Sequence, residues 1–280
     1  MLIQKWMAST YQLLPRSVAV AVQLKTRTTF TMSGAGQLQY LDRPGGHKIS
    51  YRKTEGLKSP GVIFLPGFMS NMNGGKALAV ERYSQHHGHS YVRFDYQGCG
   101  ESIGDPELAA GTRAFDVWKM DAQAVLDQLT SGPQILVGSS MGGAIMLLLA
   151  IENPTRVQAL LGVSTAVTFD KPLTYTEDNV STQASTTNEY VTPKDFWDKK
   201  YQRCLMSDSI PVTQPVCLIH GMQDDTISYM TSVDLSKRLQ SKHVDVVLRK
   251  EGQHRMSKRD DLALLVQCLG NLLSLSNSKL

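Results

Sequence analysis

The first 41 residues of this 280-residue chain contain no aspartate and no glutamate. Four basic residues lie in that stretch, and they account for the whole formal net charge of +4, because the other 25 Lys and Arg residues balance the 25 acidic residues of the chain. A body without excess positive charge offers no basic stripe to follow a phosphate backbone. We therefore do not expect a nucleic-acid partner.

The acid-free tail has the composition of an organelle-targeting sequence. It is rich in Ser and Thr and carries spaced apolar residues such as Leu13, Leu14 and Val18, a pattern typical of a mitochondrial transit peptide. A secretory signal fits less well, since Arg16 interrupts the apolar stretch. We predict a mitochondrial transit peptide over residues 1–41, with the mature chain starting before Gln37. A disordered basic tail is the alternative.

Long hydrophobic runs and closely spaced cysteines are also missing. The longest apolar run, around Ala144 to Ile151, is far shorter than the roughly eighteen residues that a membrane-spanning helix needs, so no transmembrane segment is expected. No pair of cysteines has the spacing of a zinc site or a redox motif. We therefore expect no metal and no cofactor, and free thiols at the four cysteines, Cys99, Cys204, Cys217 and Cys268.

The remaining chain alternates short β-branched runs with longer helical patterns, which is typical of a mostly parallel sheet with helices on both faces. Residues 42–280 are predicted to form one α/β domain. The expected strands are 61–65, 91–95, 134–138, 159–163, 215–220 and 244–249, with an antiparallel edge strand at 47–53. The expected helices are 75–86, 115–129, 142–152, 229–239 and 260–273.

One segment, at about residues 166–210, departs from this alternation. It is polar and Ser/Thr-rich at first and then aromatic, with Tyr190, Phe196, Trp197 and Tyr201 toward its end. Insertions of this length in a compact domain are usually functional, and we interpret this one as a lid. An ordinary surface excursion whose aromatic residues pack locally is the alternative.

The strand at 134–138 leads directly into Gly138-Ser139-Ser140-Met141-Gly142, a G-x-S-x-G motif between a strand and a helix. In that setting the serine lies on a strained turn at the end of the sheet, and glycines two residues before and after it avoid steric overlap. Ser140 is the predicted nucleophile. Ser139 has the wrong distance to the first glycine.

A serine hydroxyl needs an adjacent base to take its proton. In this type of fold the acid and the histidine follow the serine in that order. After the strand at 215–220 comes His220-Gly221-Met222-Gln223-Asp224-Asp225, and after the strand at 244–249 comes His254. We predict Asp224 as the acid, Asp225 being the alternative, and His254 as the base. His220 is expected to brace the loop by hydrogen bonding.

Acyl transfer also needs donors for the oxyanion that forms on the substrate carbonyl. One predicted donor is the backbone N–H of Met141, next to the nucleophile. The other is the N–H of Phe68, in the loop Pro66-Gly67-Phe68-Met69 that follows the strand at 61–65. Gly67 would let this backbone turn inward.

These motifs resemble the α/β-hydrolase superfamily over nearly all of the chain after residue 45. The run from Phe94 to Ser102 is similar to the superfamily's D-x-x-G-x-G-x-S loop. Within the superfamily the chain resembles the abhydrolase-domain family of mitochondrial palmitoyl-protein thioesterases, also described as acyl-glucuronide esterases. That resemblance implies an α/β-hydrolase fold and a mitochondrial location. It also implies thioesterase and esterase activity with Ser140, Asp224 and His254 as the triad.

We therefore expect a serine hydrolase that cleaves acyl thioesters and esters through an acyl-enzyme on Ser140. The expected partners are an acylated protein or a small-molecule acyl ester, with the lid aromatics as the wall of an apolar acyl channel. A monoacylglycerol lipase-like carboxylesterase or a peptidase on the same triad is the nearer alternative. A non-catalytic binding protein of the same fold is the more distant one.

Overall fold

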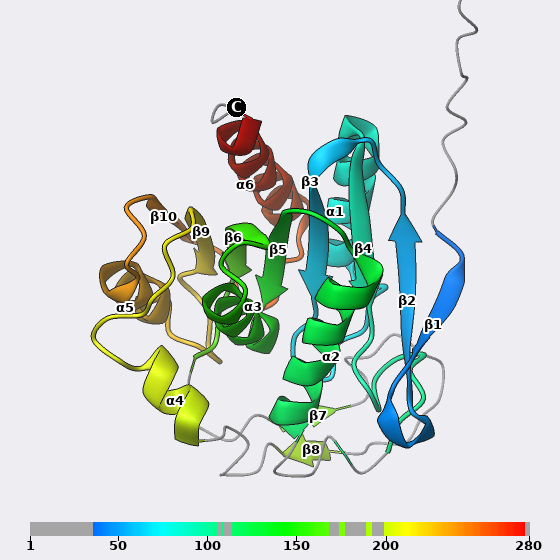
Figure 1. Cartoon of the computed structure of the whole chain (residues 1–280). Helices are drawn as coiled ribbons and strands as arrows, with labels where there is room; N and C mark the ends of the chain where they lie inside the picture. The colour runs from blue at the N-terminus through cyan, green and yellow to red at the C-terminus, as the bar shows by residue number, and fades with distance from the viewer. Residues whose placement is uncertain are drawn as a thin grey trace, which may run out of the picture. The chain divides into compact units, whose positions relative to one another are not determined.

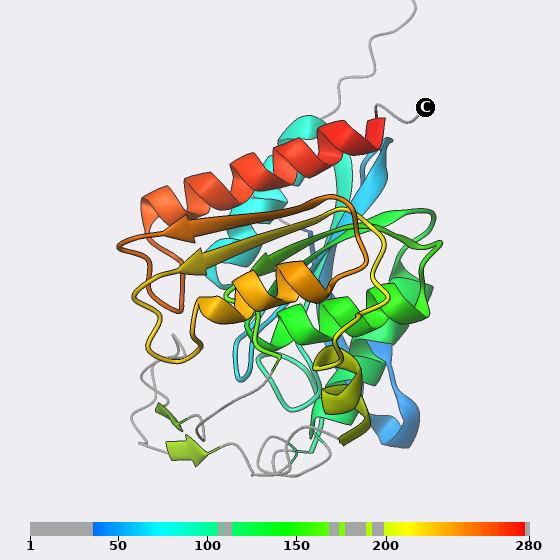
Figure 2. The same ribbon diagram turned by 90° about the vertical axis from the view of Figure 1, so that its left-hand side faces the viewer.

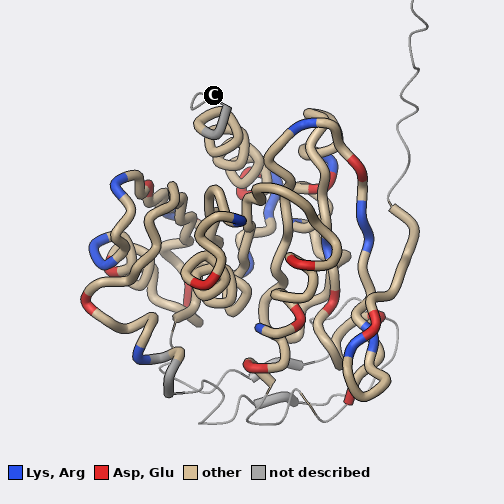
Figure 3. The backbone as a smooth tube through the Cα atoms, viewed as in Figure 1, with Lys and Arg blue, Asp and Glu red and all other residues tan. Residues whose placement is uncertain are grey.

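The computed structural model describes residues 36–105, 108, 114–167, 174–176, 189–191 and 199–277. Most of the predicted transit peptide, residues 1–35, lies outside this range, as do Phe196 and Trp197 of the predicted lid. None of the helices in the described ranges is long and apolar enough to cross a membrane. Lys and Arg positions are interspersed with Asp and Glu positions along the described backbone (Figure 3).

An eight-stranded sheet forms the centre of the fold, in the order β1-β2-β4-β3-β5-β6-β9-β10 (Figure 1). The pairs from β4 to β10 are parallel, and β1 and β2 are antiparallel to their neighbours. The strands are β1 (Leu38–Asp42), β2 (Lys48–Thr54), β3 (Lys58–Leu65), β4 (His89–Phe94), β5 (Gln134–Ser139), β6 (Val157–Val163), β9 (Val216–Gly221) and β10 (Val244–Arg249).

Helices cover both faces of this sheet, as predicted (Figure 2). Helices α1 (Gly75–His87) and α6 (Arg259–Asn277) pack together on one face, and α2 (Ala114–Leu129), α3 (Met141–Glu152) and α5 (Met230–Arg238) cover the other. Successive strand residues point to opposite faces: in β3, Val62 joins the core under α1 and α6, and Ile63 joins the core under α2 and α3. Both faces are buried along β5, β9 and nearly all of β6, which explains the apolar runs of these central strands.

Two details of the predicted sheet are wrong. The strand predicted at 47–53 is β2, and it is antiparallel, but it is not the edge strand, because β1 pairs along its outer side from Leu38↔Arg52 to Asp42↔Lys48. The sheet therefore begins at Leu38, inside the stretch predicted as transit peptide. The burial of β1 is only partial, so its sequence lacks the apolar run by which the central strands were found.

The described parts of the predicted insertion do not add a strand to the main sheet. Strands β7 (Thr174–Thr176) and β8 (Glu189–Val191) form a separate antiparallel pair, and α4 (Lys199–Leu205) follows. The buried Tyr201 ring of α4 lies 5.4 Å from the Phe115 ring of α2. This contact attaches the end of the insertion to the domain.

Candidate active site

Ser140 lies between β5 and α3 in a strained backbone conformation. Its φ of 53° and ψ of −119° are unfavourable for a residue with a side chain. Three hydrogen bonds hold it there: its N–H donates to the Val163 carbonyl at 2.9 Å, and its own carbonyl accepts the N–H of Gly143 at 2.9 Å and that of Ala166 at 3.1 Å. The neighbouring strand β6 and the residues after it thus fix the turn that presents the Ser140 hydroxyl.

The two glycines of the motif allow close backbone approach at this turn. A Cβ on Gly138 would lie 2.5 Å from the Gly142 carbonyl oxygen, and a Cβ on Gly142 would overlap the carbonyl oxygens of Leu65 and Pro66 at the end of β3. Neither position has room for a side chain, and both obstacles are backbone atoms that cannot rotate away. Steric exclusion of side chains therefore accounts for both glycines of the motif.

The structure brings Ser140, His254 and Asp224 into one chain of hydrogen bonds. The Ser140 hydroxyl Oγ lies 3.1 Å from Nε2 of His254, and Nδ1 of His254 lies 2.8 Å from Oδ2 of Asp224. The Asp224 side chain is fully buried. This is the geometry in which a histidine can take the serine proton while the carboxylate holds its ring.

Asp225, the alternative acid, is exposed, and its Oδ1 accepts a hydrogen bond from the neighbouring Thr226 hydroxyl at 3.3 Å. It makes no hydrogen bond to His254 among the contacts of the described residues. The geometry thus favours Asp224.

The acid turn after β9 and the histidine turn after β10 are packed directly against each other. The N–H of Met222 donates to the Arg249 carbonyl, and the N–H of Gln223 donates to the Gly252 carbonyl, both at 2.8 Å. A Cβ on Gly221 would overlap the backbone of Gly252. The parallel pairing of β9 with β10 places both turns at one edge of the sheet, where ligands bind in open α/β sheets.

Asp224 is held as a carboxylate. Burial by itself raises the pKa of its carboxyl, but hydrogen bonds from the His220 and His254 rings, together with the N–H of Ile227, outweigh burial and lower the pKa well below its ordinary value. Its Oδ1 also accepts the N–H of Thr226 at 2.9 Å. An ionised Asp224 is what stabilisation of a His254 imidazolium requires.

This lowered pKa predicts a pH dependence of stability. The folded-state pKa of Asp224 lies below the unfolded value of about 3.9, so its carboxylate stabilises the fold above about pH 4, and this contribution is lost as the pH falls toward the folded-state pKa. We expect the wild type to exceed Asp224→Asn in free energy of unfolding at pH 7, with a smaller difference at pH 3. Urea denaturation measures both, with the exposed Asp225→Asn as control; a difference that does not change with pH would contradict the prediction.

His220 also belongs to the site, through a contact with the acid that the sequence did not reveal. It is fully buried, and its Nε2 lies 3.0 Å from Oδ2 of Asp224 and 3.1 Å from the Ile227 carbonyl oxygen. Two acceptors at Nε2 require a proton there. With the proton on Nε2, Nδ1 accepts a hydrogen bond from the Ser232 hydroxyl, whose Oγ lies 2.7 Å away. The ring therefore braces the acid loop, and it holds Asp224 itself.

Replacing His220 should impair turnover without removing the nucleophile. In His220→Gln, the buried Oδ2 of Asp224 and the buried Ile227 carbonyl receive a poorer hydrogen-bond donor. The lost hydrogen-bond energy is about 1–3 kcal/mol, so kcat should fall about five- to a hundredfold. Ser232→Ala, which removes only the outer hydrogen bond, should lower kcat less. Steady-state kinetics per fluorophosphonate-labelled site measures both effects, and an unchanged kcat in His220→Gln would show that the ring does not position Asp224.

The predicted oxyanion donors lie beside the nucleophile. Met141 is the first residue of α3, where backbone N–H groups have no acceptor within the helix. A Cβ on Gly67 would lie 3.2 Å from the Ser139 carbonyl oxygen and 3.3 Å from the Ser140 Cβ, so the loop after β3 passes directly next to the turn. Phe68 follows Gly67 and is buried, with its ring 5.7 Å from Trp118.

No group of three or more potential metal ligands is arranged to hold an ion among the described residues. The four cysteines are free thiols, as predicted, and Cys217 is buried in β9.

Comparison with known proteins gives consistent results. Residues 60–186 match the family model described as alpha/beta hydrolase fold. The chain is 39% identical over 259 residues to the mitochondrial palmitoyl-protein thioesterase ABHD10 of Bos taurus, covering 84% of this chain and 80% of that protein. The human protein of the same name is 38% identical over 258 residues, with the same coverage. The solved structure of mouse alpha/beta hydrolase domain-containing protein 10 superposes with a TM-score of 0.73 at 36% identity, covering 85% of this chain and 99% of that one.

Proposed function

The chain belongs to the α/β-hydrolase family and is a hydrolase, and on this basis we propose that it cleaves acyl thioesters and esters through an acyl-enzyme on Ser140. The observation that carries the proposal is the hydrogen-bonded chain from Ser140 through His254 to Asp224. S-palmitoylated protein cysteines and acyl glucuronides are the proposed substrates. The relatives named as palmitoyl-protein thioesterases support the first of these.

The geometry supports the following sequence of steps. Ser140 Oγ attacks the substrate carbonyl while Nε2 of His254 takes its proton, and Asp224 stabilises the imidazolium. The N–H groups of Met141 and Phe68 would bind the oxyanion of the tetrahedral intermediate. His254 then returns the proton to the leaving thiol or alcohol, and an acyl ester remains on Ser140. Water then attacks this ester while losing a proton to His254; the bond between Ser140 Oγ and the acyl carbon breaks, and His254 returns the proton to Oγ, which releases the acid and regenerates the free serine.

A mitochondrial location is part of the proposal. The related thioesterases are named as mitochondrial proteins, and the basic, acid-free composition of residues 1–41 agrees with a transit peptide.

A series of esters, thioesters and amides with acyl chains of different lengths tests the substrate class. We expect kcat/KM to be higher for palmitoyl thioesters than for matched long-chain amides, and acyl glucuronides to be turned over as well. A clear preference for monoacylglycerols would favour the lipase alternative, and preferred cleavage of amides would favour a peptidase. Failure of the folded protein to react with a fluorophosphonate and with every ester would leave the binding-protein alternative.

The proposed acyl channel has its own test. Phe196→Ala and Trp197→Ala should reduce turnover of long-chain esters relative to short-chain ones, because these residues are predicted to line the channel. An unchanged ratio of long-chain to short-chain turnover would contradict that role.

A further inference from the structure

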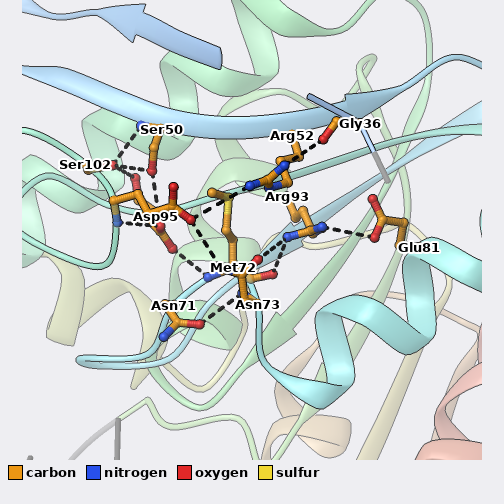
Figure 4. Close-up of polar contacts among 11 residues, drawn as sticks. Gly36, Ser50, Arg52, Asn71, Met72, Asn73, Glu81, Arg93, Asp95 and Ser102 are labelled. Carbon is orange, nitrogen blue, oxygen red and sulfur yellow. Dashed lines mark hydrogen bonds and ion pairs between the residues drawn. The ribbon is translucent and has the colours of Figure 1, made fainter. Parts of the chain in front are cut away.

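Residue Met72, at the far end of the loop that follows β3, is held by side chains on both of its backbone groups. Its N–H donates to Oδ1 of Asp95 at 2.5 Å, and its carbonyl accepts a hydrogen bond from Nη1 of Arg93 at 3.1 Å (Figure 4). Arg93 lies on β4 and Asp95 directly follows it. The same Nη1 also donates to Oδ1 of Asn73 at 2.6 Å. Two side chains at the end of β4 thus hold the backbone of Met72, one through its N–H and one through its carbonyl.

The side chains of Arg93 and Asp95 are both buried, and each also bonds to other groups of the protein. Nη2 of Arg93 pairs with Oε2 of the buried Glu81 at 3.1 Å. Oδ2 of Asp95 accepts the N–H of Glu101 at 2.9 Å and the Ser50 hydroxyl at 3.1 Å. Buried charges of this kind give little net stability compared with apolar residues of similar size. Their fixed hydrogen-bond directions are what an apolar core could not supply.

The backbone conformation of the loop that follows β4 orients the Asp95 carboxylate toward the N–H of Met72. Gly100 has a φ of 53°, and a Cβ there would overlap the Asp95 carboxylate. The absence of a side chain lets the backbone close around Asp95, so that the N–H of Glu101 reaches Oδ2 and the Ser102 hydroxyl donates to the Asp95 carbonyl at 2.6 Å. Oδ1 is thereby oriented toward Met72.

Met72 is only five positions along the chain from Gly67, which lies against Ser140. The Gly67 carbonyl accepts the N–H of Ser70 at 3.1 Å, which makes the intervening segment a tight turn. The Phe68 ring is anchored edge-on against Trp118. A loop this short, fixed at Met72 and pressed against Ser140 at Gly67, has little freedom to shift the backbone N–H of Phe68.

We propose that Arg93 and Asp95 are positioning residues of the reaction, which hold Met72 from both sides and so keep the Phe68 N–H directed at the oxyanion. The inference rests on the proposed function, since it assigns a support to one of the proposed oxyanion donors. Sequence alone did not show this role, because the contact is made to a backbone group.

The variant Asp95→Asn tests the inference, with Asp121→Asn as a matched control. Asp121 is equally buried and also accepts a backbone N–H, that of Gln97 at 2.9 Å, but it does not contact the loop of Met72 in the described structure. Active sites are counted by complete fluorophosphonate labelling, so that misfolded protein does not enter kcat. Palmitoyl-thioester kinetics and inhibition by a trifluoromethyl ketone, which binds as an oxyanion, are then measured.

We expect Asp95→Asn to lower kcat per labelled site about ten- to a hundredfold, somewhat less than removal of a whole oxyanion donor, with KM within about twofold of wild type. Trifluoromethyl ketone affinity should fall in parallel with kcat/KM. Asp121→Asn should keep the wild-type kcat per labelled site even if its melting temperature drops. A merely structural Asp95 would give the same kcat per site in both variants, and that result would overturn the inference.

Arg93→Lys provides a second route if Asp95→Asn does not fold. Lysine keeps a positive charge for Glu81 but lacks the planar fork that reaches Glu81 and Met72 together. The same reduction in kcat and in ketone affinity is expected, and wild-type values for both would overturn the inference. An inactive, unlabelled wild type would refute the proposed function itself, whereas an active wild type with unaffected variants would refute only this inference.

Discussion

The variant Ser140→Ala is expected to lose about 10⁴- to 10⁶-fold in kcat with thioester and ester substrates, because it lacks the atom that forms the acyl-enzyme. It should also lose all labelling by a fluorophosphonate. The fold should be retained, since alanine removes only the hydroxyl and the backbone hydrogen bonds of residue 140 to Val163 and Ala166 remain. Circular dichroism and a thermal melt establish this before the kinetics are compared.

Ser139→Ala is the matched control for that variant. Ser139 is the adjacent serine, buried at the end of β5. Its replacement by alanine also removes one hydroxyl group, but at the neighbouring residue. Labelling and turnover should stay within a few fold of wild type. Loss of labelling in Ser139→Ala with retention in Ser140→Ala would reverse the assignment of the nucleophile.

The second large effect is expected at the acid. Asp224→Asn should lower kcat about 10⁴-fold, because an amide in place of the carboxylate no longer stabilises the imidazolium of His254 and favours the wrong ring tautomer. Its distance of 2.8 Å to Nδ1 of His254 gives it this role. A pre-steady-state measurement of acylation with an ester substrate separates this loss from any change in substrate binding.

Asp225→Asn is the control that the sequence itself supplies. The two aspartates are adjacent and undergo the same chemical change, but Asp225 is exposed and its carboxylate contacts Thr226. We expect kcat within about threefold of wild type. Equal losses in the two variants would mean that the loop as a whole, and not one carboxylate, supports His254.

The sequence predicted those parts of the site that depend on short motifs placed directly after apolar strands. Ser140, Asp224 and His254 each follow an apolar strand, and the parallel arrangement of β5, β9 and β10 brings those strand ends to one edge. Their meeting in space follows from the order of motifs along the chain. The central strands were recognisable for a related reason, since burial on both faces requires continuous apolar runs.

Features that depend on the tertiary structure were not recognisable. Strand β1 is a partly exposed edge with no apolar run, so the sheet begins earlier than the sequence indicated. The contact of His220 with Asp224 was not predicted, and another partner of the same ring, Ser232, lies on α5, twelve residues further along the chain. The contact between Asp95 and Met72 joins a side chain to a backbone N–H, which leaves no pattern in residue types.

Trapping of the acyl-enzyme shows whether Ser140 carries the acyl group during turnover. Wild-type protein is mixed with a palmitoyl thioester, quenched in acid within milliseconds to seconds, and analysed by intact-mass and peptide mass spectrometry. We expect one palmitoyl group in ester linkage to Ser140, formed at least as fast as turnover and absent in Ser140→Ala. Turnover without any such adduct, or a palmitoyl group attached kinetically competently to a different residue, would contradict this expectation.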